Sequence, residues 1–200
     1  AARATRAFGD AARQAGEDAG QAGERAAEGA DEARQAHEEA AAATEPGAEG
    51  LFFLPYLVGE RSPHNNPEAR GAFVGLSLRH TKAHMTRSVI EGVNFALRDC
   101  LEAIRALKID IREVRATGGG ARGAFWTQNL ADVLGVRVRT VQSEEGPALG
   151  AALIAGVGAG VYKDLKSAAK RAVHLGETRS PHPARRKFYE ARGSDDVRAH

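Results

Sequence analysis

Three consecutive glycines, Gly118 to Gly120, are the feature of the sequence that most directly predicts chemistry. They lie in Thr117-Gly-Gly-Gly-Ala-Arg-Gly123, between a strand-like and a helix-like stretch. Glycine has no Cβ, so the backbone amides of such a loop can approach a phosphate or a sugar closely. The N-terminus of the following helix adds a field that favours negative charge. The pattern predicts an anion- or nucleotide-binding loop, and it is not a P-loop because no Gly-Lys-Ser/Thr follows.

The same loop satisfies a second pattern, the dinucleotide-binding sequence G-x-G-x-x-G, at Gly118, Gly120 and Gly123. Glu144 follows about 20 residues later, beyond the next strand-like stretch, where that motif places its ribose-binding acid. An NAD(P)-binding Rossmann-type module is therefore one alternative. A tight strand-to-helix turn without any ligand is another.

Two other groups of polar side chains have spacings that chemistry can use. His80 and His84 stand four residues apart, with Glu91 further on, and this spacing can place two imidazoles on one metal ion. Capping and surface hydrogen bonding are the more ordinary roles for such histidines. Glu144 and Glu145 are paired carboxylates, which can do acid–base work, but carboxylates before a helix start ordinarily complement the helix dipole. We therefore predict no metal site and assign no catalytic residue.

A mixed order of strands and helices positions these residues. Apolar runs and alternating patterns predict strands at 51–58, 71–78, 109–116 and 136–141. Three-to-four spacing of apolar residues predicts helices at 81–107, 124–134, 148–161 and 167–175. Gly92 indicates close approach of another backbone to the long helix, and Gly135 is typical of a helix end. This order predicts an α/β fold with a mixed sheet flanked by helices.

The long helix has a predicted buried face with regular apolar spacing. The residues of this face are Met85, Val89, Val93, Ala96, Leu97, Cys100, Leu101, Ile104 and Leu107.

Composition divides the 200 residues into two unlike parts. The net charge of +2 combines −6 in residues 1–50 with +8 in the remainder. The first fifty residues are rich in Ala and Gly and contain one large apolar side chain, Phe8. Such a segment buries too little surface to form a core. We therefore predict a helical or disordered Ala-rich arm that ends near Pro46-Gly47.

Several classes of protein are excluded by simple counts. The single cysteine, Cys100, rules out an intramolecular disulfide framework and fits a reducing compartment. The first residues show no basic-then-apolar pattern, so we expect no secretory leader. The most apolar run, 148–161, is shorter than the roughly 20 residues of a membrane-spanning helix. We expect a cytoplasmic protein that binds neither membrane nor nucleic acid.

Several stretches together resemble a known family. The pattern Gly71-Ala-Phe-Val-Gly-Leu76, followed after seven residues by His84-Met-x-x-Ser-Val-Ile-Glu91, is similar to a signature of the FGGY carbohydrate kinases. The stretch from Phe53 to Gly71 resembles the xylulokinase branch of that family. So do Leu78-Arg-His-Thr81, Thr117–Ala121 and Glu144–Leu153. The resemblance covers about residues 45–175.

The resemblance implies a fold and a site. Family members have two actin-like (ribonuclease H-like) domains that close over a sugar and ATP with Mg²⁺, and this chain resembles the C-terminal one. It implies nucleotide binding by Gly118, Gly119, Gly120 and Ala121, and by Arg79, His80 and Thr81 on the adenosine side. Gly123 stands where relatives often have a small polar residue that bonds the base or ribose. The implied domains are an arm at 1–49, the nucleotide-side domain at 50–192 and a tail at 193–200.

The resemblance also implies a limit to activity. The Asp-x-Gly-Thr loop, the sugar-binding residues and the catalytic Asp of the family belong to its first domain, which residues 1–44 do not resemble. We therefore expect the C-terminal half of a kinase that converts D-xylulose to D-xylulose 5-phosphate, inactive alone. Related sugars, a homodimer and a non-catalytic remnant stay open as alternatives.

Overall fold

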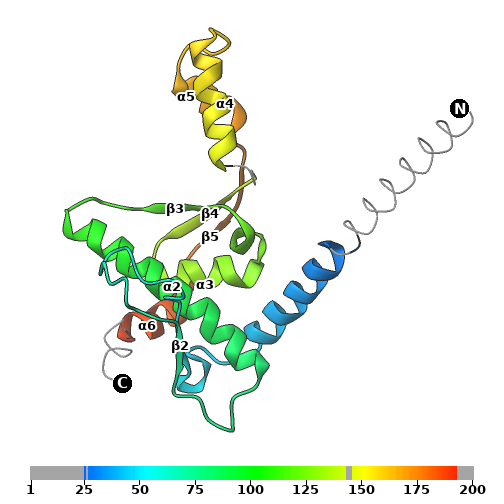
Figure 1. Ribbon diagram of the computed structural model, residues 1–200, viewed down its shortest axis with the longest axis vertical. Coiled ribbons are helices and arrows are strands. Elements are labelled where there is room, and N and C mark those ends of the chain that lie inside the picture. Colours follow the sequence, from blue (N-terminus) through cyan, green and yellow to red (C-terminus); the bar gives the residue numbers. More distant parts are fainter. Residues whose placement is uncertain (1–24, 26, 143–145, 193–200) are drawn as a thin grey trace, which may run out of the picture.

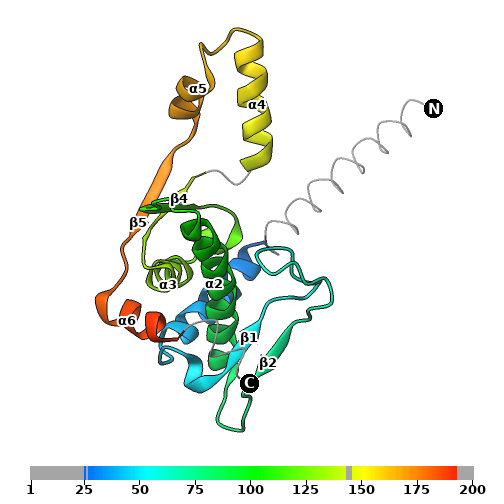
Figure 2. The same ribbon diagram turned by 90° about the vertical axis from the view of Figure 1, so that its left-hand side faces the viewer.

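The computed structural model describes residue 25 and residues 27–142 and 146–192. Figures 1 and 2 show a body built around the long helix α2, with one helical hairpin standing away from it. The tail at 193–200 and the pair Glu144 and Glu145 lie outside the described residues, as does most of the arm.

The first two strands form a small sheet of their own. β1 (Phe52–Leu54) pairs antiparallel with β2 (Ala72–Val74), and the rings of Phe53 and Phe73 lie 4.8 Å apart. Both strands are shorter than the stretches 51–58 and 71–78 predicted from sequence. Pro55, which has no amide hydrogen for a ladder, directly follows the end of β1. The residues of β1 are only half-buried, although the continuous apolar run 51–58 is typical of a strand buried on both faces.

Helix α2 (Lys82–Ala106) confirms the predicted long helix to within a residue at each end. Its N-cap, Thr81, forms a capping box with the side chain of His84. Gly92 confirms the predicted close approach, because a Cβ there would overlap the backbone oxygen of Phe53 in β1. β1 therefore lies directly on α2, as Figure 2 shows.

The buried face of α2 differs from the predicted apolar one. Leu97, Ile104 and Leu107 are exposed, and Met85, Val89 and Val93 are half-buried. The side chains that the fold buries are mainly polar: Arg87, Ser88, Glu91 and Asn94, with Ile90 and Leu101. Polar partners on other elements, described below, make this burial favourable.

The strands that follow α2 in the chain form a separate three-stranded sheet. Its order is β3 (Glu113–Ala116), β4 (Arg137–Val141) and β5 (Leu175–Arg179), with β3 and β4 parallel and β5 antiparallel. Helix α3 (Ala124–Leu134) connects β3 to β4 and confirms its predicted bounds, and it ends at Gly135 with φ 65°. Side chains from α2, α3 and the start of β4 make the core: Leu101, Leu130, Ala131, Leu134, Val136 and Val138.

The last elements depart most from the sequence prediction. Helix α5 (Leu165–Ala172) begins before the predicted 167–175 because Asp164 caps its N-terminus, and it ends earlier because the backbone of Val173 is extended. β5 and helix α6 (Pro183–Ala191) were not predicted. Helix α4 (Gly146–Gly158) packs on α5 to form the hairpin that stands away from the sheet in Figures 1 and 2.

The Ala-rich arm is helical over residues 27–42. Its last turns reach the body: Glu38 is 7% exposed and Ala41 is fully buried. A 3-10 turn, η1 (Ala48–Gly50), then leads into β1. The end of a segment that composition describes as coreless therefore contributes to packing.

Candidate functional site

The glycine loop joins the end of β3 to the start of α3. Gly118 has φ 89°, a left-handed conformation that favours glycine, and η2 (Gly119–Arg122) follows as one 3-10 turn. A Cβ at Gly118 or Gly119 would meet no other atom within 4 Å, so this part of the loop is open. Gly123 is the N-cap of α3 and supplies no side-chain cap. The backbone donors of the first turn of α3 therefore lack the usual side-chain acceptor.

Helix 27–42 lies across the far end of this loop. A Cβ on Gly123 would overlap both carboxylate oxygens of Glu38. Arg34 donates from Nη1 to Glu38 Oε1 over 3.0 Å. This hydrogen bond raises the pKa of the Arg34 guanidinium. Gly123 is the position at which the resemblance places a side chain that binds the base or ribose. In this chain the carboxylate of Glu38, from the arm, fills the space that such a side chain would take.

Two cavities open between this helix and the body. The first, about 480 Å³, borders the glycine loop and the start of α3, and its lining includes Arg34, Glu38, Arg122 and Gly123. The second, about 370 Å³, is more apolar and is lined by Met85, Val89, Ile90 and Trp126, with Arg34 and Glu38 at its side. Because both cavities share Arg34 and Glu38, a polar space at the loop adjoins an apolar one at the Trp126 ring.

The turn before α2 holds the other predicted nucleotide-binding residues. Arg79 pairs with Glu49 at 3.2 Å, and His80 Nδ1 accepts from the amide of Ser77 at 2.9 Å. Thr81 caps α2, as described above. All three side chains therefore have roles within the chain, and no cavity described above is lined by any of them.

His80 and His84 lie with ring centroids 5.7 Å apart. Across the part of the chain that the structure describes, no three His, Cys, Asp or Glu side chains are grouped to hold a metal ion. His84 instead completes the capping box of α2 and lies 3.8 Å from Glu49. Within the same residues, no helix is long and apolar enough to cross a bilayer.

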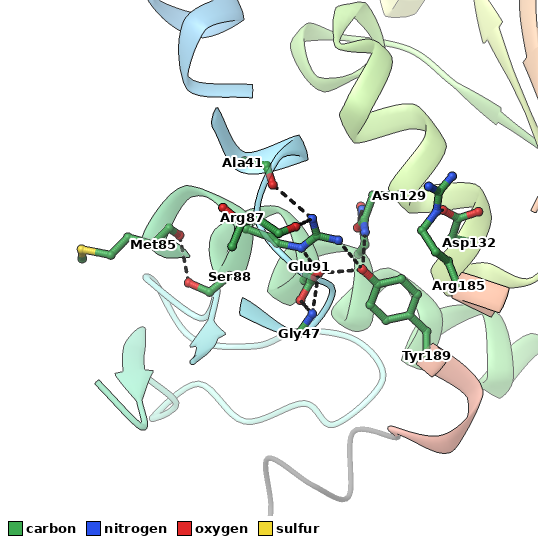
Figure 3. A network of polar contacts seen from close by, with 12 residues as sticks. Ala41, Gly47, Met85, Arg87, Ser88, Glu91, Asn129, Asp132, Arg185 and Tyr189 are labelled. Atoms are coloured by element: carbon green, nitrogen blue, oxygen red, sulfur yellow. Dashed lines mark hydrogen bonds and ion pairs between the residues drawn. The ribbon is translucent and has the colours of Figure 1, made fainter. Parts of the chain in front are cut away.

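A buried polar network, shown in Figure 3, is the group of residues that sequence reasoning missed. Tyr189 Oη donates to Glu91 Oε1 at 2.6 Å and accepts from Arg87 Nη2 at 3.1 Å. Arg87 Nε donates to Glu91 Oε1 at 2.7 Å. Glu91 also accepts from the amide of Gly47, and Arg87 donates to the carbonyls of Ala41 and Thr44.

Burial and charge set the protonation of this network. Desolvation raises the pKa of the Tyr189 phenol well above its ordinary range, and the Glu91 carboxylate raises it further. Desolvation acts to lower the pKa of the Arg87 guanidinium, but Glu91 and Tyr189 outweigh it and the pKa is raised. The network therefore holds a neutral phenol between a guanidinium and a carboxylate.

A second contact fixes α6 to α3. Asp132, 1% exposed, accepts from Arg185 Nε at 2.6 Å and from the amide of His182 at 2.7 Å.

The sequence offered one local signal for the residues of the buried network, the i, i+4 spacing of Arg87 and Glu91. Nothing local to Tyr189 indicates that its partner lies 98 positions earlier.

A separate, mostly apolar cavity of about 480 Å³ lies between β1, the following loop and α2. Phe53, Tyr56 and Phe95 line it, with Glu60, Glu91 and Asp99 among its polar residues. It contains none of the predicted nucleotide-binding residues.

Comparison with known proteins places this geometry in a family. Residues 2–159 match the model of the FGGY family of carbohydrate kinases, C-terminal domain. The chain is 39% identical to a xylulose kinase of Staphylococcus epidermidis over 144 residues, which is 72% of this chain and 29% of that protein. The chain thus spans less than a third of the length of this relative.

Solved structures agree with that match. A xylulose kinase from Rhodospirillum rubrum is similar with a TM-score of 0.72 and 32% identity, over 87% of this chain and 35% of that one. A gluconate kinase from Lactobacillus acidophilus is similar with a TM-score of 0.70 and 31% identity, over 78% and 32%. These neighbours confirm the predicted actin-like α/β fold. They favour a kinase domain over the dinucleotide-binding alternative, whose acidic residue Glu144 lies outside the described residues.

Proposed function

The chain belongs to the FGGY family of carbohydrate kinases, as its C-terminal domain, and on this premise we propose that it binds ATP at the glycine loop. The observation that carries the proposal is the open loop itself, where Gly118 and Gly119 leave room for phosphate oxygens against the backbone. The adjoining apolar cavity at Trp126 is of a size and character that suit an aromatic base.

We propose specific roles for the predicted residues. Gly118, Gly119, Gly120 and Ala121 contact the phosphates through their backbone, and the first turn of α3 favours their charge. Arg79, His80 and Thr81 belong to the same proposed site only indirectly, because each already has a partner within the chain. They shape the start of α2, whose Met85 lines the apolar cavity.

We propose that Mg²⁺ binds together with the nucleotide. The residues that the structure describes include no group of three His, Cys, Asp or Glu side chains that could hold a metal ion. This does not fit a metal ion bound by side chains of this chain alone. Mg²⁺ ordinarily binds phosphate oxygens and water with few protein ligands. We therefore propose the magnesium complex of ATP as the substrate form.

The sugar is proposed to be D-xylulose, because the family match and the xylulose kinases above support that branch. The similarity to a gluconate kinase makes gluconate the alternative to test beside it. We propose that these 200 residues by themselves bind ATP without phosphorylating either compound, since they span 29% of the Staphylococcus relative. ATP-dependent turnover by the isolated chain would contradict this part.

The test of nucleotide binding is a glycine substitution that fits the fold. Gly119→Ala adds a methyl group in open space at an ordinary φ, so we expect an unchanged melting temperature. The methyl group obstructs the proposed phosphate position, so we expect ATP affinity to fall about tenfold or more. Calorimetric titration of ATP, and of NAD in parallel, measures both constants.

Gly158→Ala is the matched control, because a Cβ there also meets nothing within 4 Å and Gly158 ends the distant helix α4. We expect it to leave ATP affinity unchanged. Wild-type chain that binds NAD more tightly than ATP would overturn the proposal, as would equal ATP affinity in the Gly119→Ala variant.

A further inference from the structure

We propose that Tyr189 is a positioning residue for the proposed nucleotide cleft, which is the pair of cavities between the glycine loop and helix 27–42. Through a buried chain of hydrogen bonds it holds both walls of this cleft, the glycine loop on one side and helix 27–42 on the other. The inference rests on the proposed function for the identity of the ligand. It assigns a role to a residue of α6, which lies beyond the family match at 2–159.

The chain of hydrogen bonds begins at the Tyr189 hydroxyl, on a side chain that is fully buried. Besides its bonds to Glu91 and Arg87, Tyr189 Oη accepts from Asn129 Nδ2 at 2.9 Å. Asn94 Nδ2 donates to Asn129 Oδ1 at 2.7 Å, and Trp126 Nε1 donates to Asn94 Oδ1 at 3.1 Å. From Trp126 to Glu91 every donor therefore points toward the carboxylate, an arrangement in which hydrogen bonds strengthen one another.

Trp126 connects this chain of hydrogen bonds to the glycine loop. Its ring lies against Gly120, where a Cβ would be only 3.2 Å from the indole carbons. The ring therefore packs against the loop, and its indole N–H donates to Asn94. Asn94 and Asn129 are both buried, so neither amide can turn to water when a partner is lost.

Tyr189 also holds the opposite wall of the cleft, helix 27–42, through Glu91 and Arg87. Glu91 accepts from the amide of Gly47, and Arg87 donates to the carbonyls of Ala41 and Thr44. These backbone groups lie in the last turn of helix 27–42 and just after it, next to the turns that carry Arg34 and Glu38. Figure 3 shows the Tyr189 hydroxyl where bonds from Glu91, Arg87 and Asn129 meet. One phenol thus connects both walls.

Tyr189→Phe tests this role, because it removes one hydroxyl and keeps the ring. We expect amide hydrogen exchange to quicken at Gly118–Gly123 and in residues 38–47 of the nucleotide-free chain. We also expect ATP affinity to fall about tenfold at a temperature where circular dichroism shows a folded variant.

Leu101→Ala is the control for lost stability, because Leu101 is an apolar core residue that takes no part in this chain of hydrogen bonds. It should lower the melting temperature while leaving ATP affinity and loop exchange near wild type. If Tyr189→Phe does not fold, Trp126→Phe removes the bond to Asn94 together with part of the ring that lies against Gly120. It should quicken exchange at Gly118–Gly123 in the same way.

Unchanged loop exchange in the folded variants would overturn the positioning role, whatever their stability. Unchanged ATP affinity beside a wild type that binds ATP would overturn it as well. A wild type that does not bind ATP would instead overturn the proposed function. Exchange in the nucleotide-free chain would then still decide whether Tyr189 holds the loop.

Discussion

At the scale of single residues, Tyr189 is the most constrained side chain of the network. Its hydroxyl makes three hydrogen bonds, and its ring packs edge-on against Phe95 and Phe188 at 5.9 and 5.2 Å between centroids. A buried phenolate beside Glu91 would place two negative charges together in a region of low dielectric. The phenol therefore stays protonated in the folded chain to higher pH than in the unfolded one.

This difference predicts a pH dependence of stability. Below the ordinary tyrosine pKa of about 10, both states hold the proton and the contribution of Tyr189 is fully present. Above that pH the unfolded chain loses the proton while the folded chain keeps it, so stability falls, by at most ~1.4 kcal/mol per pH unit. Urea unfolding between about pH 9 and 11 should show a steeper decline in wild type than in Tyr189→Phe. Parallel declines would contradict the prediction.

At the scale of elements, the contact of β1 with α2 depends on Gly92. The backbone oxygen of Phe53 occupies the space that any Cβ at this position would need. Backbone atoms cannot rotate away as a flexible side chain can, so a substitution must separate the two elements. The short sheet of β1 and β2 is thereby fixed by one position on the helix.

Gly92→Ala is therefore expected to destabilise the chain by about 1–3 kcal/mol, the usual cost of overpacking. Gly150→Ala is the matched control, because Gly150 is also helical and its Cβ would meet nothing within 4 Å. Ala in place of a helical Gly should raise stability by about 0.5–1 kcal/mol. Urea unfolding measures both changes, and a neutral Gly92→Ala variant would mean that β1 moves freely on α2.

At the scale of the whole molecule, the network joins three segments that lie far apart in the sequence. Arg87 and Glu91 on α2 bind the backbone of 41–47 on one side and Tyr189 of α6 on the other. Both charged side chains are at most 4% exposed. A buried pair of this kind contributes little by itself, but removing one partner leaves an uncompensated charge.

Arg87→Met is accordingly expected to cost about 3–5 kcal/mol in the free energy of unfolding, because Glu91 stays buried without its cation. The double variant Arg87→Met/Glu91→Leu removes both charges and should recover a large part of that loss. A double-mutant cycle by urea unfolding measures the coupling of the pair. Additive single effects would show that Arg87 and Glu91 act independently.

Local patterns in the sequence determined the elements of the site. The bounds of α2 and α3, the end of α3 at Gly135 and the close approach at Gly92 were predicted, because periodicity, capping and glycine conformation act over a few residues. The strand–glycine loop–helix arrangement was predicted for the same reason. The assignment of the loop to a nucleotide stays a prediction.

Only the tertiary structure decided which side chains hold these elements together. The buried face of α2 is mainly polar. Its polar side chains can be buried because their partners are buried with them, and apolar periodicity cannot reveal such residues. Tyr189 meets Arg87 across 102 positions of chain, on a helix that the sequence did not predict. Propensity and spacing describe neighbours along the chain, whereas the partners of a buried charge exist only once the fold has brought them together.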